Sequence, residues 1–329
     1  AWNLPAAAGF HGRGAPSVTF FDVGQGDSAL LVGPKGELVL LDGGPDPFLV
    51  KKKLAARGLR YLDAVIYSHG DRDHVEGLAE VIAELQVGVL MRPAMAPGAG
   101  AEREVLEAAM ARGVPVVELG GGERVAVGEL VLDVVGGPSL LDPGAETGDS
   151  PKGSPRNEAS LVVSVKLEGV TFLFPGDIEE VGQGYLLEGG HELKADVLKL
   201  PHHGGFAANT ERFLDEVDPR AAIISVGTPN EYGHPSAGTL RSLERRGCRV
   251  FRTDESGDIV VRASKGRVMV QEERCPDQKK GGGERELSTL PRSAAVFRSG
   301  LMKGSRAPGR ESRDPGNVGM SLDGIGTRV

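Results

Sequence analysis

The chain has 329 residues, 40% of them hydrophobic and 26% charged, which is enough to bury a sizeable core in one large or two ordinary domains. No apolar run approaches the roughly 18 residues of a membrane-spanning helix, and two cysteines cannot build a disulfide framework or a thiolate zinc site. The net charge of −8 divides into −12 for residues 1–275 and +4 for residues 276–329, so the acidic part does not by itself favour binding to a phosphate backbone. A bound divalent metal would reverse that sign locally.

The predicted elements alternate between strands and helices along most of the chain. Residues 1–16 predict a linker, without an initiator Met or a signal pattern, which suggests a piece of a longer protein or a processed chain. Strands are predicted from apolar β-branched runs between turn residues, at 17–22, 28–32, 38–41, 61–68, 88–92, 114–119, within 123–136, and at 161–166, 170–174, 197–200, 221–226, 250–253, 258–262 and 268–271. Helices are predicted from helical periodicity and end signals at 48–57, 75–85, 103–112, 210–216 and 237–246. This interleaving predicts an α/β fold.

Composition also predicts the domain limits. The ordered domain is expected over residues 17–271, interrupted by a mobile loop at about 138–157 that is dominated by Gly, Pro, Ser and Asp. Residues 272–329 predict a disordered tail, with a DNA-touching arm as the alternative interpretation.

Four potential metal ligands lie in one short segment after the predicted strand at 61–68. They are His69, Asp71, Asp73 and His74, and side chains of a strand-to-helix loop can converge on one ion. Imidazole with carboxylate suits Zn, Mn or Fe, and the carboxylates favour Mn. The alternative is a solvated polar loop with Asp73 as the helix N-cap, but two histidines and two aspartates within six residues favour a metal site.

Later motifs supply further polar groups. Asp177 follows a Pro-Gly at a strand end, where it would either bridge two cations or cap the next segment. His202 and His203 follow another strand, so that one histidine could bind metal while the other contacts substrate or carries protons. Ser236 is a predicted N-cap of a helix that could receive a phosphate. His234 would stabilise that anion or protonate a leaving group, or else be a loop histidine packed under the following proline.

Three aspartates are expected near the same rim. Asp42, at the end of a strand, is expected to orient the metal ligands through hydrogen bonds without binding the metal itself. Asp22 and Asp27 are assigned the same role, although Asp27 beside glycines fits a turn residue equally well.

The motifs together resemble a known family. The pattern His-x-Asp-x-Asp-His resembles the metallo-β-lactamase superfamily signature His-x-His-x-Asp-His, with Asp71 in the second histidine position. Over residues 17–265, the chain is similar to the metallo-β-lactamase-like domain of the ComEC family of bacterial competence proteins. The motifs that carry this resemblance are FDVGQGDS, LLDGG, SHGDRDHVEG, RNEASLV, PGD, KLPHHG and YGHPS.

The resemblance implies an αββα four-layer sandwich and a centre for one or two divalent ions, Mn²⁺ or Zn²⁺. The first ion would take His69 and Asp71, and the second would take Asp73, His74 and a final histidine, for which we favour His202. Asp177 would bridge the ions. Asn157 stands where many members have another histidine, which leaves the number of ions open. Catalytic roles are expected for Asp73, His203 and His234, and substrate contacts for Asn157, Ser160, His203, His234 and Ser236.

The resemblance further implies a function in DNA uptake. The enzyme would be a metal-dependent nuclease, without a small organic cofactor, that degrades the strand of DNA that is not transported; its partner would be DNA, in single-stranded form. It would lie on the extracytoplasmic face of the bacterial cell membrane as a soluble part of a protein whose remainder forms a membrane channel. One alternative is a small-molecule metallo-hydrolase acting on a phosphoester, lactone or β-lactam, which the acidic charge favours. Another is a non-catalytic DNA-binding module, which would not need so many ligand-type residues.

Overall fold

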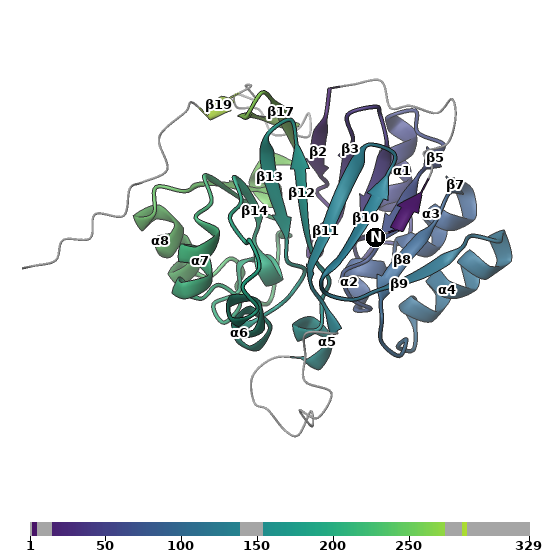
Figure 1. The fold of residues 1–329 in the computed structure, drawn as a ribbon, viewed down its shortest axis with the longest axis horizontal. Coiled ribbons are helices and arrows are strands. Elements are labelled where there is room, and N and C mark those ends of the chain that lie inside the picture. Colours follow the sequence, from purple (N-terminus) through teal and green to yellow (C-terminus); the bar gives the residue numbers. More distant parts are fainter. Residues whose placement is uncertain (1, 5–14, 139–153, 274–284, 288–329) are drawn as a thin grey trace, which may run out of the picture. The chain divides into compact units, whose positions relative to one another are not determined.

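Two large β-sheets pack face to face in the computed structural model, which describes residues 2–4, 15–138, 154–273 and 285–287 (Figure 1). Within these residues, the first sheet has the order β19 (Arg285–Leu287), β18 (Arg267–Glu273), β17 (Asp258–Ser264), β2 (Ser17–Phe20), β3 (Ala29–Val32), β4 (Leu38–Leu41), β6 (Ala64–Ile66), β8 (Leu90–Pro93) and β9 (Val116–Leu119). The second has the order β1 (Trp2–Leu4), β10 (Glu123–Val127), β11 (Leu130–Gly136), β12 (Val162–Leu167), β13 (Val170–Phe174), β14 (Val197–Lys199), β15 (Ala221–Ile224) and β16 (Arg249–Arg252).

Helices cover the outer face of each sheet, which confirms the predicted αββα sandwich (Figure 1). The first sheet is covered by α1 (Leu49–Ala56), α3 (Leu78–Glu84) and α4 (Ala101–Arg112), and the second by α6 (Glu180–Glu188), α7 (Glu211–Val217) and α8 (Ala237–Arg245). Short helical turns lie in the connections: α2 (Arg72–Val75), α5 (Pro155–Glu158), η2 (Pro201–Gly204) and α9 (Thr253–Ser256). In the described part of the chain, no helix has both the length and the apolar character to cross a membrane.

Alternating side chains build the core between the sheets. In β13, Phe172 and Phe174 face the opposite sheet, whereas Leu173 between them packs under the outer helices. The ring of Phe174 stacks on that of Phe20 from β2, with centroids 5.7 Å apart. Because successive side chains of a strand point to opposite faces of the sheet, each apolar strand contributes to two faces, one packed on the other sheet and one packed on the helices.

Parallel pairing brings several loops to one rim. Strands β4, β6, β8 and β9 are parallel in the first sheet, and β13 to β16 are parallel in the second. Backbone hydrogen bonds join the loop that follows β6 to two further segments. The N–H of Asp27, between β2 and β3, donates to the carbonyl of Asp73, and that of Leu161, just before β12, donates to the carbonyl of Ser68, which links the two halves of the chain. Polar side chains at these strand ends are thereby gathered in one place.

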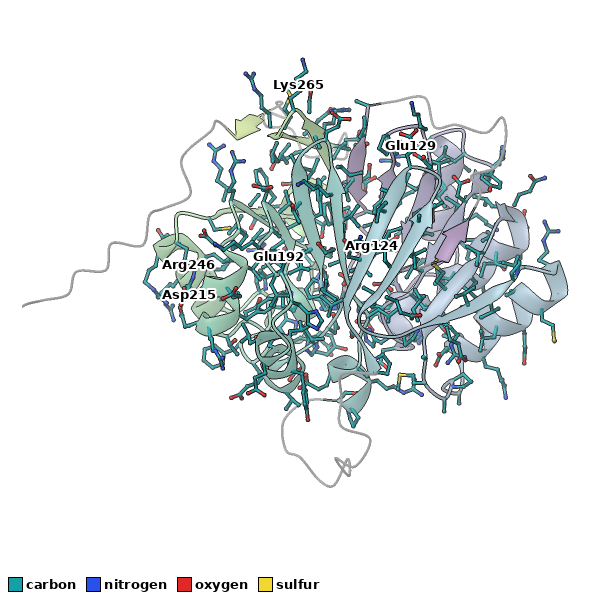
Figure 2. All side chains as sticks on the ribbon, in the orientation of Figure 1. Arg124, Glu129, Glu192, Asp215, Arg246 and Lys265 are labelled. Atoms are coloured by element: carbon teal, nitrogen blue, oxygen red, sulfur yellow. The ribbon has the colours of Figure 1, made fainter. Side chains whose placement is uncertain are left out.

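The surface of the outer helical layer carries exposed ion pairs. Arg246, at the end of α8, lies 2.6 Å from a carboxylate oxygen of Asp215 in α7, and both are labelled in Figure 2. Exposed pairs of this kind stabilise a fold by about 0–1 kcal/mol, so the packing of α7 and α8 depends mainly on their buried apolar faces.

The predicted elements differ from the structure in a few places. The predicted strand at 61–68 is divided into β6 and a separate β5 (Tyr61–Leu62), which pairs with β7 (Gln86–Val87) in a two-stranded sheet. The predicted helix at 75–85 starts later, as α3, because the N–H of Gly77 donates to the carbonyl of Gly44 and not to a carbonyl of the preceding turn. Helix α6 was not predicted, since two glycines interrupt its helical pattern.

The predicted domain limits are only partly within the described residues. Strand β1 lies in the predicted linker, and α5 lies in the predicted loop at 138–157. Strand β18 extends two residues beyond the predicted end at 271, and β19, which pairs with it, lies in the predicted tail. The remaining parts of the linker, loop and tail lie outside the described residues.

Replacing Phe172 by alanine tests the core between the sheets. Phe172→Ala should lower the free energy of unfolding by about 3–5 kcal/mol, because this fully buried ring would leave a cavity. The control Phe206→Ala removes a ring that is 78% exposed and should cost less than about 0.5 kcal/mol. Urea denaturation of both variants measures the difference, and equal losses would contradict this description of the core.

Candidate metal centre

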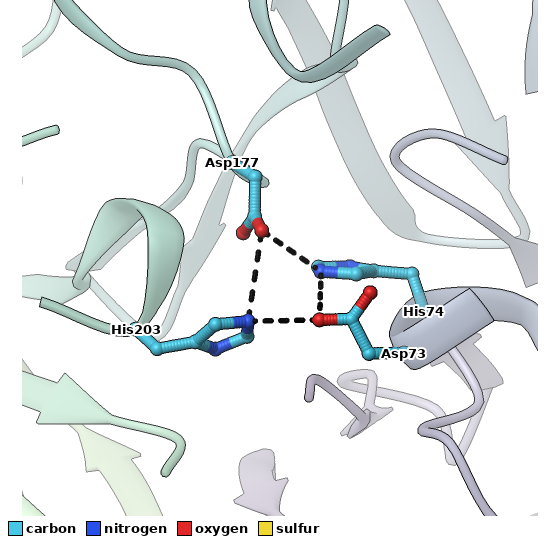
Figure 3. Close-up of side chains that lie close together, drawn as sticks. All are labelled: Asp73, His74, Asp177 and His203. Atoms are coloured by element: carbon cyan, nitrogen blue, oxygen red, sulfur yellow. Dashed lines mark hydrogen bonds and ion pairs between the residues drawn. The ribbon is translucent and has the colours of Figure 1, made fainter. Parts of the chain in front are cut away.

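Four side chains from distant parts of the chain meet at the shared rim of the sheets. Asp73 and His74 come from α2, which follows β6, while Asp177 follows β13 and His203 follows β14. Figure 3 shows the four side chains pointing toward one another, and their ligand-type atoms lie within 4.8 Å of one another. His74 Nε2 is 3.3 Å from Asp177 Oδ2, and His203 Nε2 is 3.3 Å from Asp73 Oδ2.

The histidines of the centre are oriented through their Nδ1 atoms. His74 Nδ1 lies 3.0 Å from Asp42 Oδ2, whose other oxygen accepts the N–H of Ser68. His203 Nδ1 donates to the carbonyl of Ser225 at 3.0 Å, and His69 Nδ1 is 3.1 Å from Ser68 Oγ. With a proton held on Nδ1, each ring in its neutral form directs the Nε2 lone pair toward the centre, which is the usual arrangement of metal-binding histidines. Nε2 of His69 and of His74 is buried without a hydrogen-bond partner.

The pair predicted for a first ion is also brought to this rim. The buried ring of His69 lies 4.2 Å from the ring of His74, and His69 Nε2 is 3.7 Å from Asp71 Oδ2. Asp71 occupies the N-cap position of α2 that was predicted for Asp73, yet its side chain makes no capping hydrogen bond. Its other oxygen is 3.9 Å from Nη1 of Arg156. Asn157, the next residue, has a buried Oδ1 without a hydrogen-bond partner.

The two adjacent histidines lie in different positions. His203 is 1% exposed and belongs to the four-residue group, whereas His202, which we favoured as the ligand, is 29% exposed at the rim. His202 Nδ1 is 2.6 Å from Glu179 Oε1, which leaves Nε2 3.9 Å from Asp177 Oδ2. Both residues have positive φ angles, so the turn separates their side chains. The structure therefore places His203, and not His202, in the four-residue group.

A buried lysine also contacts the centre; it begins the motif KLPHHG, but no role was predicted for it. Lys199, the last residue of β14, is 4% exposed, and its Nζ forms an ion pair with Asp27 and lies 3.7 Å from Asp177 Oδ1. The sequence does contain a signal, because Lys199 is a charged residue within an otherwise apolar strand. Asp27 also contacts His203 Nδ1 at 3.4 Å, which supports the predicted orienting role rather than the turn residue.

Two expected positions differ from the structure. Asp22 accepts the N–H of Gly24 and its own N–H donates to Asp258, so in the described part of the chain its contacts lie away from the centre. Ser160 was expected to contact substrate, but it is fully buried and its Oγ accepts the N–H of Asp177. Ser160 therefore fixes the backbone of Asp177.

The remaining predicted substrate contacts lie at the rim. The ring of His234 is 5.4 Å from that of His202, and its Nδ1 is buried without a hydrogen-bond partner. Ser236 caps α8 as predicted, with Oγ accepting the N–H of Thr239 at 3.0 Å.

Charges within the centre shift the pKa values of its members strongly. Burial alone would raise the pKa of Asp27, but Lys199, His203 and His74 lower it to about 2. Burial would lower the pKa of His203, but Asp177 and Asp27 raise it to about 9. The pKa of His69 falls to about 3 through burial and the neighbouring His74. The pKa values thus favour an ionised Asp27 and a doubly protonated His203 at neutral pH. Burial instead raises the pKa of Asp42 and of Asp71.

The donor set fits a divalent metal ion. Carboxylate oxygens and imidazole nitrogens are ligands for Mn²⁺ and Zn²⁺, and here they include buried nitrogens without hydrogen-bond partners. The carboxylates of the centre outnumber its single buried lysine; they belong to Asp27, Asp42, Asp71, Asp73 and Asp177.

Comparisons with known proteins agree with this fold. The family described as Metallo-beta-lactamase superfamily matches residues 21–228. ComE operon protein 3 of Bacillus subtilis (strain 168) is 32% identical over 265 residues, which cover 74% of this chain and 33% of that protein. Competence protein ComA of Neisseria gonorrhoeae is 27% identical over 259 residues, which cover 78% and 33%. The chain therefore spans about a third of the length of these curated relatives.

A solved structure shares the fold. A mutant of the CmlA beta-hydroxylase has a TM-score of 0.50 at 14% identity, over 76% of this chain and 55% of that chain. The resemblance expected from the motifs is thereby confirmed for the superfamily and for relatives named as competence proteins.

Replacing Asp42 tests the orientation of His74. Asp42→Asn should weaken Mn²⁺ or Zn²⁺ binding by about 10- to 100-fold, because the carboxylate that holds His74 Nδ1 is lost. The matched control is Asp22→Asn, another strand-end aspartate, which should leave the affinity unchanged. Calorimetric titration with each metal measures both, and an equal loss in the control would contradict the assigned roles.

The pH dependence of metal binding tests the charge balance. Below about pH 9 the imidazole of His203 carries a second proton that a metal must displace, so affinity should rise from pH 7 toward pH 9 and then level off. Calorimetry in buffers with different ionisation enthalpies should detect the released proton. Affinity that is constant over this range, without proton release, would be the contrary result.

Proposed function

Because the chain belongs to the metallo-beta-lactamase superfamily, we propose that it is a metal-dependent phosphodiesterase that hydrolyses DNA. The observation that carries the proposal is the arrangement of three buried histidines, each fixed through Nδ1 and each directing Nε2 toward a group of carboxylates. Such an arrangement binds cations, and a cation is what the cleavage of an anionic ester requires.

In this proposal, Asp73, His74, Asp177 and His203 hold one divalent ion, and His69 and Asp71 contribute to a second with help from Asn157. When bound, a divalent ion lowers the pKa of water and stabilises the developing negative charge on a phosphate. The abundance of carboxylates favours Mn²⁺ over Zn²⁺.

The chain's own residues would orient the substrate and move protons. The side chain of Asp73 is 36% exposed, and His74 and His203 lower its pKa against the effect of burial, so it can accept a hydrogen bond from an attacking water. His202, whose Nδ1–H donates to Glu179, lies at the rim, where the doubly protonated ring could also donate from Nε2 to a phosphate oxygen.

His234 would serve the leaving oxygen. Burial and the nearby His202 and His203 lower the pKa of His234 to about 4, so it is neutral at pH 7. An anionic phosphate beside it would raise that pKa, because a negative charge favours the protonated imidazole. The ring can then donate a proton to the departing group.

The relatives support DNA as the substrate. Two of them are named as a ComE operon protein and a competence protein, and this chain corresponds to about a third of each. We infer that the chain is the nuclease part of a larger membrane-associated protein, on the extracytoplasmic side, where it degrades the strand that is not taken up through the channel part.

Hydrolysis assays with defined substrates test the proposal. The Mn²⁺- or Zn²⁺-loaded chain should cleave single-stranded DNA and bis(4-nitrophenyl) phosphate but not a β-lactam. Asp73→Ala should lower kcat by more than about 100-fold, since even residues behind metal ligands typically cost 10- to 100-fold. The control Asp215→Asn changes an exposed residue of α7 and should keep full activity.

Two outcomes would contradict this function. Cleavage of the lactam alone would favour the small-molecule hydrolase, which the charge of −12 on residues 1–275 also favours. If no substrate is cleaved with either metal while Asp73→Ala still binds DNA, the chain is a non-catalytic binding module.

A further inference from the structure

Two aromatic rings at the rim of the metal centre are unusually exposed. Phe206 is 78% exposed and Tyr232 is 72% exposed, more than any other aromatic side chain that the structure describes. Burying a ring of this size stabilises a protein by about 1.5–3 kcal/mol, and single exposed residues need no explanation. Two such rings beside one candidate site, in a chain with only 5% aromatic residues, suggest a ligand that covers them.

The Tyr232 ring lies on His234, and the Phe206 ring lies at the start of α8. The ring of Tyr232 stacks on that of His234, with centroids 5.9 Å apart and planes inclined by 29°. Phe206 follows Gly205, where an added Cβ would lie 3.0 Å from His234 Nε2. The Phe206 ring itself rests on Gly238 of α8, where an added Cβ would lie 2.9 Å from the ring.

A continuous row of rings leads from solvent to the metal centre. The His234 ring lies 6.4 Å from that of the buried His203, so a single imidazole separates Tyr232 from a residue of the four-residue group. Phe206 is the third residue after His203 along the chain, and its ring packs on Gly238 in the helix that Ser236 caps. Tyr232 therefore lies two ring contacts from the centre, and Phe206 follows the turn that carries His203.

The charge of the chain limits other ways of holding a nucleic acid. Non-specific binding usually depends on lysine and arginine contacts to phosphates, yet residues 1–275 carry a net charge of −12. Stacking of bases on aromatic side chains does not need that charge, and it accepts any sequence because every base has a π-face.

We propose that Tyr232 and Phe206 form a base-binding subsite that holds an unpaired nucleobase next to the phosphate to be cleaved. The inference rests on the proposed function and specifies its substrate as single-stranded DNA or a frayed strand end. Bases inside a duplex are covered by their neighbours, so they must leave the stack before they can lie on a protein ring.

Binding of labelled oligonucleotides, measured by fluorescence anisotropy with the full chain in EDTA to prevent cleavage, tests the subsite. Tyr232→Ala and Phe206→Ala should each weaken binding of a single-stranded oligo(dT) by roughly 5- to 100-fold, the usual range for the loss of one stacked base. Tyr232→Phe keeps a ring and should bind like the wild type. Met110→Ala, a control 78% exposed on α4, should change nothing.

An abasic oligonucleotide of the same length separates stacking from phosphate contacts. The wild type should bind it as weakly as the Tyr232→Ala variant does, and the effect of the substitution should disappear on this ligand. A blunt duplex should also bind more weakly than the single strand. Equal binding of oligo(dT) by the wild type and both alanine variants would overturn the inference, as would equal affinity of the wild type for oligo(dT) and the abasic strand.

Hydrolysis of bis(4-nitrophenyl) phosphate by the metal-loaded wild type is measured separately. If this ester and DNA are cleaved while the alanine variants bind oligo(dT) normally, the proposed function stands and the subsite does not exist. If base-dependent binding is found without any cleavage, the subsite stands and the phosphodiesterase function is wrong.

Discussion

Negative charge buried between the two sheets is the constraint on which the rest of the structure depends. Asp27, Asp42 and Asp177 are almost completely buried, with Asp73 beside them. Buried carboxylates are costly unless cations or hydrogen-bond donors accompany them. Lys199 supplies one positive charge to balance the carboxylates. The pKa values of His74 and His203 are raised, so protonation of these two imidazoles supplies further positive charge. A divalent ion at the same place would replace those protons.

The topology explains why the charges gather there. Strands β4 and β6 in the first sheet and β13, β14 and β15 in the second run parallel to neighbours, so the residues that follow them emerge at one rim. The hydrogen bonds made by Asp42, Ser68 and Ser225 then fix which imidazole nitrogen faces the centre. Strand pairing thus determines which residues lie at the centre, and hydrogen bonds from neighbouring polar groups determine how their side chains are oriented.

Much of this arrangement could be predicted from the sequence, and the remainder depends on local geometry. The α/β fold, most strands, and the grouping of His74, Asp73 and Asp177 follow from patterns and motif order. The choice between His202 and His203 does not, because it depends on two left-handed backbone conformations in a short turn.

Other errors have similar causes. Ser160 and Asp22 both lie near strand ends, but a side chain's direction there depends on which backbone groups remain unpaired, and this is known only from the fold. Lys199 was overlooked although a lysine within an apolar strand is a visible anomaly. The two glycines of α6 concealed a helix that packing against the second sheet stabilises.

The division of donors between the sheets has a mechanical consequence. The first half of the chain supplies Asp73 and His74, and the second half supplies Asp177 and His203, so neither half holds the set alone. An ion bound by all four residues would connect the two halves of the chain, and its binding free energy would add to the free energy of unfolding. Removal of the ion would therefore lower the free energy of unfolding of the whole sandwich, to which the apolar core between the sheets also contributes.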